Sequence, residues 1–377
     1  MKRWIWALAK IAVAAVLIWY VIGQIETRDH LEILPADPSD QPEILTGDFT
    51  GDWRTQEWTF SADDRPEAFH GGDPRLRPQP GFFTALAGLH PGWFALGVLA
   101  WGALLVLSGL RWHRLLAAAG VANSLRHSLR LTFIGHFFNN VMFGATGGDL
   151  VRAVLVTRGL QENRWRAALS VLVDRLLGLF VLLMFAAVVL TVAWRQGDFE
   201  RVPALHKVWI FVLALLGAAA AGGGTYLSQR ARRLLRLDAL LARIPAQGTI
   251  AKVDGALTVY REQPRAVLGA LLLSVPLQAC GILSFWAFAR ALGAALAPDD
   301  AAVVFPVVQT VSALPIAPAG WGIGETLYGF FFARYGVGFT LGVGTSVLFR
   351  LATQVGWGLV GGALWAFSRE RREERRT

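Results

Sequence analysis

The chain has 377 residues, of which 54% are hydrophobic and only 17% are charged, and its formal net charge is +9. A soluble protein of this length carries more charge and shorter apolar runs, so the composition argues against a soluble fold. The basic residues lie between apolar segments instead of along one polar face, which argues against a nucleic-acid partner. With a single cysteine, Cys280, the sequence has neither a disulfide framework nor a thiolate metal cluster.

Six apolar segments are long enough to cross the hydrocarbon core of a bilayer, which takes about 20 helical residues. They are residues 4–22, 91–110, 168–193, 208–227, 266–289 and 338–367. The first follows Met1-Lys2-Arg3, as in a signal peptide, but its apolar run is long for one and no small-residue cleavage site follows Gly23. We therefore predict a retained N-terminal anchor helix.

Two further apolar segments, 130–149 and 303–333, are broken by glycine, proline and amide residues. Arginines flank the first of them on both sides, with Arg126 before it and Arg152 after it. Since cytoplasmic loops carry an excess of Arg and Lys, both ends of this segment are predicted on the cytoplasmic side. The same rule places both ends of the second segment outside. We therefore predict two re-entrant hairpins that enter from opposite faces.

Residues 24–90 carry 13 Asp and Glu against 5 Arg, a net charge of about −8. An acidic stretch after a helix that starts in the cytoplasm is expected outside, as a loop or as a small cap seeded by Trp53, Trp58 and Phe60. The predicted protein is thus an all-α, multi-pass protein of the bacterial inner membrane with both termini in the cytoplasm. Its parts are the anchor 1–23, the acidic segment 24–90, the membrane domain 91–367 and the basic tail 368–377.

The two broken segments resemble each other. Each passes from amides or hydroxyls through small residues to a glycine followed directly by an acid, Asp149 or Glu325. Downstream, the run SVLVDR that ends at Arg175 resembles the run SVLFR that ends at Arg350. The acid and the arginine are 26 residues apart in the first half and 25 in the second. Repeats in opposite orientations with broken helices are typical of transporters, whose binding sites lie near the midplane.

Several charged residues within these segments have two readings. Arg350 lies too deep to reach the surface, so it either serves a site or forms a structural ion pair with Glu325 or Asp149. The two acids follow glycines, so each either caps a helix or belongs to the site. Asp174 and Arg175 are predicted to divide between a cross-helix salt bridge and a cavity.

The polar residues around the first break also have two possible roles each. Arg152 is either the local partner of Asp149, one turn earlier, or a clamp for a headgroup. Asn139 and Asn140 are expected to satisfy broken backbone, with direct ligand contact as the alternative. His136 is expected to be a hydrogen-bonded packing residue, with a proton relay as the alternative.

Three segments carry a family resemblance: FFNNVMFGATGGDLVRAVLVTR (137–158), ALSVLVDRLLGL (168–179) and ALPIAPAGWGIGETLYGFFFARYGV (313–337). They resemble the flippase-like membrane domain of the lysylphosphatidylglycerol synthase family, over about residues 90–367. The resemblance implies a lipid-translocating domain with eight membrane segments, two of them re-entrant. By position it implies a site formed by Asn139, Asn140, Gly147, Gly148, Asp149, Arg152, Asp174, Arg175, Pro315, Gly320, Gly322, Gly324, Glu325 and Arg350.

Bifunctional members of that family continue into a soluble aminoacyl-transfer domain, whereas this chain ends at Thr377, so we expect no synthase activity. No metal or cofactor is expected, because the sequence lacks HExxH, paired CxxC, P-loop and GxSxG motifs. The predicted function is a lipid flippase that moves an anionic or lipid-linked substrate. The alternatives are a non-transporting regulator of a cell-envelope enzyme that docks through 24–90, and an intramembrane enzyme that uses His136 and Asp149. The expected partners are membrane lipid, an envelope protein and, left open, a second copy of the chain.

Overall fold

The computed structural model describes residues 26–35, 42–141, 147–158, 160–227, 257–313 and 322–373, with a few isolated positions between them. The anchor predicted over residues 1–23 lies almost wholly outside this part of the chain. The same holds for Pro315 and Gly320 of the predicted site.

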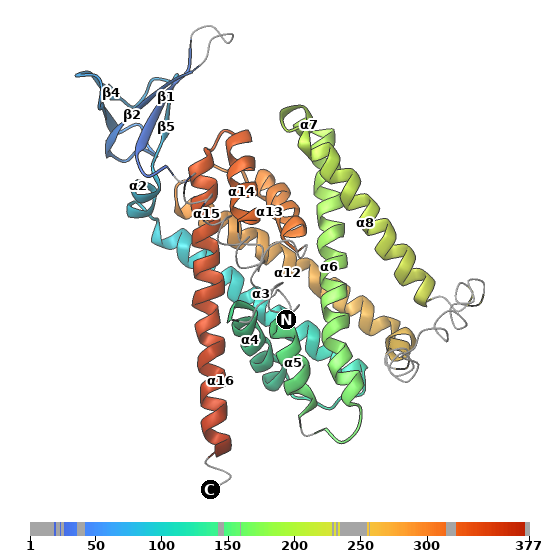
Figure 1. Cartoon of the computed structure of the whole chain (residues 1–377). Helices are drawn as coiled ribbons and strands as arrows, with labels where there is room; N and C mark the ends of the chain where they lie inside the picture. The colour runs from blue at the N-terminus through green and yellow to red at the C-terminus, as the bar shows by residue number, and fades with distance from the viewer. Residues whose placement is uncertain are drawn as a thin grey trace, which may run out of the picture.

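The acidic segment folds into a five-stranded antiparallel sheet, which we call the cap (Figure 1). The order of its strands is β4-β3-β2-β1-β5. The strands are β1 (Asp29–Ile33), β2 (Glu43–Gly51), β3 (Trp58–Ala62), β4 (Ala68–His70) and β5 (Leu76–Gln79). Side chains that alternate along them, Leu31, Leu45, Trp58 and Phe60, are buried on one face, as the period-two geometry of a strand requires. The cap is thus a folded unit with its own apolar face.

Asp29 ties the cap to the chain that leads into the membrane domain. Its carboxylate is buried and accepts hydrogen bonds from the main-chain N–H of Gly81, at 2.7 Å, and of Phe49, at 3.1 Å. The cap also contacts the helices through Trp53 and Arg54. A Cβ atom built on Gly293, where φ is +82°, would collide with both of these side chains, so only glycine fits there.

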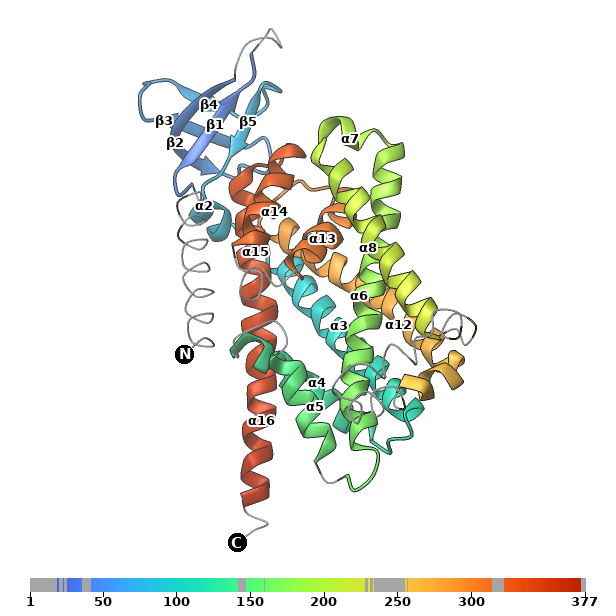
Figure 2. The ribbon, with the colours of Figure 1, turned by 45° about the vertical axis from the view of Figure 1, so that its right-hand side comes forward.

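The rest of the described chain is helical (Figures 1 and 2). The helices are α2 (Phe82–Ala87), α3 (Pro91–Ala118), α4 (Leu125–Val141), α5 (Gly147–Thr157), α6 (Arg164–Arg195), α7 (Asp198–Arg201), α8 (Ala204–Leu227), α12 (Pro264–Ala291), α13 (Pro298–Ser312), α14 (Ile323–Arg334), α15 (Phe339–Arg350), the π-helical turn η2 (Leu351–Gly356) and α16 (Trp357–Glu373).

Five helical segments among the described residues are long and apolar enough to cross a membrane: Pro91–Ala118, Arg164–Arg195, Ala204–Thr225, Pro264–Ala291 and Phe339–Phe367. They coincide with five of the six predicted full spans. The sixth is the N-terminal anchor, which lies outside the described residues. The predicted all-α polytopic membrane fold is confirmed, with the small cap sheet added to it.

The helix α3 extends past the predicted span 91–110 and ends at Ala118. The apolar side chains of Trp112, Leu115 and Leu116 continue the helix and are fully buried. Arg111, which directly follows the predicted span, therefore lies inside the helix and is only 5% exposed.

Each broken segment forms two packed helices on either side of its break. In the first half α4 and α5 flank residues 142–146, and in the second half α13 and α14 flank residues 314–321. The α13–α14 pair lies toward the cap, while α4 and α5 lie in the half of the bundle toward the C-terminal end of α16 (Figure 2). The two helix pairs thus lie in opposite halves of the bundle.

We predict that Asp29→Ala loosens the cap, because it leaves the buried N–H of Gly81 and the partly buried N–H of Phe49 without an acceptor, and a buried donor left unpaired costs about 1–3 kcal/mol. Hydrogen–deuterium exchange at the amides of Phe49 and Gly81 should accelerate. Asp48→Ala removes an exposed carboxylate from the same sheet and should leave these rates unchanged. Equal exchange in the two variants would contradict this account of how the cap is attached.

Candidate functional site

A buried ion cluster starts at Arg111 on α3. Its Nε donates to Asp174 Oδ1 on α6 at 2.8 Å, and its Nη2 donates to the main-chain oxygen of Asp174 at 3.2 Å. Its Nη1 donates to Ser274 Oγ on α12 at 2.8 Å. One guanidinium therefore joins three membrane helices, and the geometry explains why a charge is tolerated within apolar helices.

Arg152, on α5, lies on the other side of the Asp174 carboxylate. Its Nη2 is 3.6 Å from Asp174 Oδ2, and its Nη1 is 3.5 Å from Asp149 Oδ1, one turn earlier. The guanidinium carbon lies 4.2 Å from the centroid of the Trp112 ring, in cation–π contact. Arg152 is only 7% exposed, yet its Nε and Nη2 have no hydrogen-bond partner among the described residues. Arg152 is therefore a buried cation whose Nε and Nη2 can each donate a further hydrogen bond.

The cluster is completed by Arg175, whose Nη1 is 2.7 Å from Asp149 Oδ2. Its side chain is 39% exposed, so Arg175 is the member that faces open space. The cluster contains three arginines and two aspartates and therefore has one positive charge more than negative. The surplus positive charge lies at the wall of a cavity, where a bound anion would offset it.

Asn139 satisfies the start of α5, because its Oδ1 accepts a hydrogen bond from the N–H of Gly148 at 2.8 Å. Gly147 and Gly148 are buried. A Cβ atom on Gly148 would overlap the main-chain oxygen of Gly135 on α4, so glycine here permits the close packing of the two helices. Of these predicted site residues, the glycines shape the backbone and Asn139 caps it.

In the second half, Glu325 is paired with Arg350. The Arg350 Nε lies 2.7 Å from Glu325 Oε1, and both side chains are more than nine-tenths buried. Glu325 Oε2 also accepts from the N–H of Gly322 at 2.7 Å, where φ is +85°, so the same carboxylate caps α14. At Gly324 a Cβ atom would lie 2.5 Å from Arg350 Nη2, which explains the small residue there.

The π-helical turn η2 follows Arg350 directly and links the two halves. A π turn shifts the helical hydrogen-bond pattern and leaves main-chain carbonyls in need of other donors. Two side chains of α4 meet this need: His136 Nε2 donates to the Thr353 oxygen at 2.8 Å, and Asn140 Nδ2 donates to the Gln354 oxygen at 2.6 Å. The first half is thereby fastened to the helix that carries Arg350.

Two cavities adjoin these groups. The Arg350 chamber, of about 330 Å³, is lined by Arg350, Asn140 and residues of α13. The Arg152 chamber, of about 290 Å³, is lined by the ion cluster around Arg152. Arg175, His136 and Asn139 line both chambers, so the two spaces meet at these residues. Of the predicted site residues, the lining of the Arg152 chamber contains Asn139, Asp149, Arg152, Asp174 and Arg175, and the lining of the Arg350 chamber contains Asn139, Asn140, Arg175 and Arg350.

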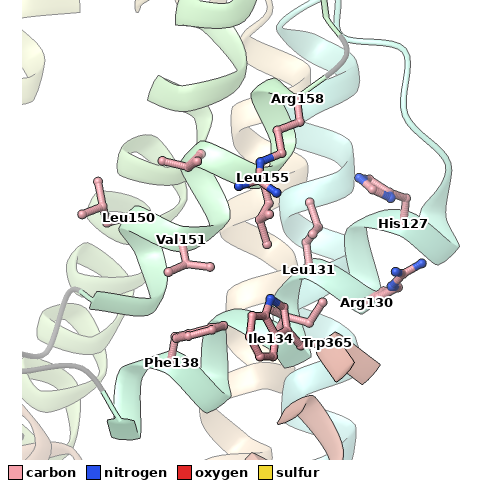
Figure 3. A pocket seen from close by; sticks show the side chains of 11 residues that line it. His127, Arg130, Leu131, Ile134, Phe138, Leu150, Val151, Leu155, Arg158 and Trp365 are labelled. Atoms are coloured by element: carbon pink, nitrogen blue, oxygen red, sulfur yellow. The ribbon is translucent and has the colours of Figure 1, made fainter. Parts of the chain in front are cut away.

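A third cavity is an apolar groove of about 510 Å³ that shares no lining residue with the chambers. Figure 3 shows side chains of α4 and α5 forming its walls, with Trp365 of α16 at one end. Its lining includes Ile134, Phe138 and Leu155, together with three basic side chains, His127, Arg130 and Arg158. Among its described lining residues none is acidic.

Sequence reasoning missed Arg111, Trp112 and Ser274. Arg111 follows an apolar run directly, and a basic residue in that position reads as a loop marker. Ser274 and Gln278, one turn apart within the apolar segment of α12, are a signal that points to a polar helix face, and both are buried. Pro315 and Gly320 fall outside the described residues, so their predicted roles stay predictions.

We predict that Arg111→Ala strongly destabilises the protein, because it removes the three buried hydrogen bonds that join α3 to Asp174 and Ser274, and a buried acceptor left without its donor costs about 1–3 kcal/mol. Thermal unfolding in detergent should show a marked fall in Tm. Arg114→Ala, which removes an exposed arginine one turn along the same helix, should leave Tm nearly unchanged. The double variant Arg111→Ala/Asp174→Ala should lose less than the sum of the two single losses, and strict additivity would refute the coupling.

Comparison with known proteins places this architecture in a family. A family model described as the lysylphosphatidylglycerol synthase TM region matches residues 81–361, which leaves the cap sheet outside the match. A UPF0104 membrane protein of Methanothermobacter thermautotrophicus is 25% identical over 295 residues, which cover 74% of this chain and 84% of that protein. The resemblance expected from the sequence is thus confirmed, and the chain belongs to the family of the lysylphosphatidylglycerol synthase transmembrane region.

Proposed function

We propose that the protein is a lipid transporter that moves an anionic or lipid-linked headgroup across the bacterial inner membrane through the two chambers. The observation that carries this proposal is Arg152, a buried guanidinium that lines a chamber with two donor atoms unused. Guanidinium groups bind phosphate and carboxylate through two parallel hydrogen bonds, so an anionic headgroup in this chamber would meet both the surplus charge and the free donors.

The second chamber extends the path for such a headgroup. Arg175 borders both chambers and is the most exposed member of the ion cluster, so it is suited to pass an anion between them. Arg350 lines the far chamber but is paired with Glu325, which keeps its attraction for the anion lower than that of Arg152. Moderate binding at successive sites favours transport, because each step remains reversible.

The internal repeat supports an alternating movement of two halves. The sequence relates Asp149 to Glu325 and Arg175 to Arg350, and both of these acid–arginine pairs are closed at 2.7 Å. In this proposal the α4–α5 and α13–α14 helix pairs are re-entrant hairpins from opposite faces, related as inverted repeats.

The apolar groove of Figure 3 supports the lipid part of the proposal. Its apolar walls suit an acyl chain, and His127, Arg130 and Arg158 suit an anionic headgroup at the cytoplasmic leaflet. The transport we propose needs no covalent chemistry. His136 Nε2 donates a hydrogen bond to the Thr353 oxygen and the Asp149 carboxylate lies against two arginines, so these two residues contact other groups and not each other.

The test is transport in proteoliposomes containing a phosphatidylglycerol with a fluorescent acyl chain, monitored by membrane-impermeant dithionite. We expect Arg152→Met to slow the movement about tenfold or more, because charge-assisted hydrogen bonds to an anion contribute about 1.5–3 kcal/mol. The melting temperature should hardly fall, since the remaining two arginines and two aspartates balance and the methionine retains the apolar stem against Trp112.

Arg195→Met is the matched control, because it removes an exposed arginine from the end of α6, away from the chambers. It should transport like the wild type. If folded wild-type protein moves no phosphatidylglycerol, zwitterionic phospholipid or polyprenyl phosphate lipid, the transporter proposal fails, and regulation of a cell-envelope enzyme takes its place.

We also predict that Glu325→Gln lowers the maximal rate while raising the apparent affinity for the anionic lipid. The amide still accepts the N–H bond of Gly322 but no longer neutralises Arg350, so an anion should leave the Arg350 chamber more slowly. The initial rate measured against lipid fraction separates the two effects. Glu262→Gln, at an exposed position, is the control, and a parallel loss of rate there would contradict a role specific to Glu325.

A further inference from the structure

A pocket of about 590 Å³ lies between the cap and the ends of the membrane helices that face it. The cap contributes Trp53, Arg54 and Arg77 to its lining. The helical domain contributes His90 and Trp93 from the start of α3, Arg290 from the end of α12, and Tyr335 from the residue after α14. The pocket is distinct from both chambers, with which it shares no lining residue.

The charge of this pocket is opposite to that of the cap. Residues 24–90 carry about eight more negative than positive charges, yet the described pocket lining has three arginines, one histidine and no acid. The other three cap arginines are paired on the surface, Arg28 with Asp63, Arg65 with Glu43 and Arg75 with Asp73.

The two cap arginines that line the pocket differ from these three in their partners. Neither Arg54 nor Arg77 forms an ion pair within the described part of the chain. Arg54 donates to the main-chain oxygen of Gly88 and lies over the Trp53 ring at 5.1 Å, while Arg290 donates to the Ala294 oxygen at 3.3 Å. These contacts orient the guanidinium groups without neutralising them.

The position of the pocket suggests what would neutralise them. Its helical residues are at the termini of membrane helices, where lipid headgroups lie and where Trp and Tyr are enriched. Arginine at such a position extends toward the phosphates of the adjacent leaflet. A phosphate at this level would meet several guanidinium groups with free donors, and amphipathic rings would contact its glycerol or sugar part.

We propose that this pocket binds the phosphate-bearing headgroup of an anionic membrane lipid at the membrane face that carries the cap. The site assigns a role to the cap, which lies outside the family match. It does not depend on transport through the chambers, since it is formed by other residues and needs only the folded cap on its helices.

The test uses the full chain in nanodiscs, with Cys280→Ser and Ala295→Cys so that one environment-sensitive dye reports from the pocket wall. Phosphatidylglycerol is raised stepwise in a phosphatidylcholine background. In a second arm, glycerol 3-phosphate is added in solution to nanodiscs of phosphatidylcholine alone. We expect a saturable dye response to phosphatidylglycerol and little response to glycerol 3-phosphate.

Arg77→Ala and Arg290→Ala should each raise the midpoint of this response about tenfold. Arg75→Ala is the matched control, two residues from Arg77 and outside the pocket, and should leave the midpoint unchanged. Arg152→Met should also leave it unchanged, so the result is readable whether or not the protein transports lipid. No dye response, or equal shifts in Arg75→Ala and Arg77→Ala, would overturn the proposal. A response to glycerol 3-phosphate alone would overturn the lipid source and assign the pocket to a soluble phosphate ester.

Discussion

The Asp174 carboxylate is the group on which the arrangement of the first half depends. One of its oxygens binds Arg111 of α3 at 2.8 Å, and the other faces Arg152 of α5 at 3.6 Å. Because a charge within hydrocarbon must be paired or hydrated, this one anion fixes how three helices can pack. One carboxylate cannot neutralise two guanidinium groups, and Asp149 is in turn shared with Arg175. The resulting surplus of positive charge is therefore a consequence of the packing itself, and it lies at the wall of a cavity.

The two acid–arginine pairs have the same geometry but different surroundings. Glu325 also caps its helix, and its carboxylate forms an ion pair with the buried Arg350. The negative charge of Glu325 therefore balances the positive charge of Arg350. In the first half the Asn139 amide accepts the N–H of Gly148, and the Asp149 carboxylate lies against two arginines. A repeated motif has thus acquired unequal charge in its two halves. In the transport we propose, that inequality would give the two chambers different affinities for an anion.

Much of this could be predicted from the sequence, because hydrophobic length and repeated spacing are local properties. The sequence offered Glu325 as one of two partners for Arg350, and the matched separations of 26 and 25 residues relate this pair to Asp149 and Arg175, which are also paired in the structure. Arg111 could not be placed, since an arginine that ends an apolar run looks the same in a loop and in a continuing helix. The turn η2 had no local signature either, because its carbonyls are satisfied by His136 and Asn140, more than 200 residues earlier. Contacts between segments that are distant in the sequence determine both the burial of Arg111 and the turn η2.

The acidic surface of the cap bears on how an anion reaches the pocket beneath it. A free phosphate ester approaching through water would meet the net negative charge of the cap, whose influence extends over a Debye length of about 8 Å at physiological ionic strength. A lipid headgroup arrives along the membrane surface and avoids that approach. Inside the pocket, contact with Arg54, Arg77 and Arg290 outweighs the more distant, screened carboxylates, because ion pairs strengthen steeply at short range. An acidic cap with a basic underside thus favours ligands that are already held in the membrane.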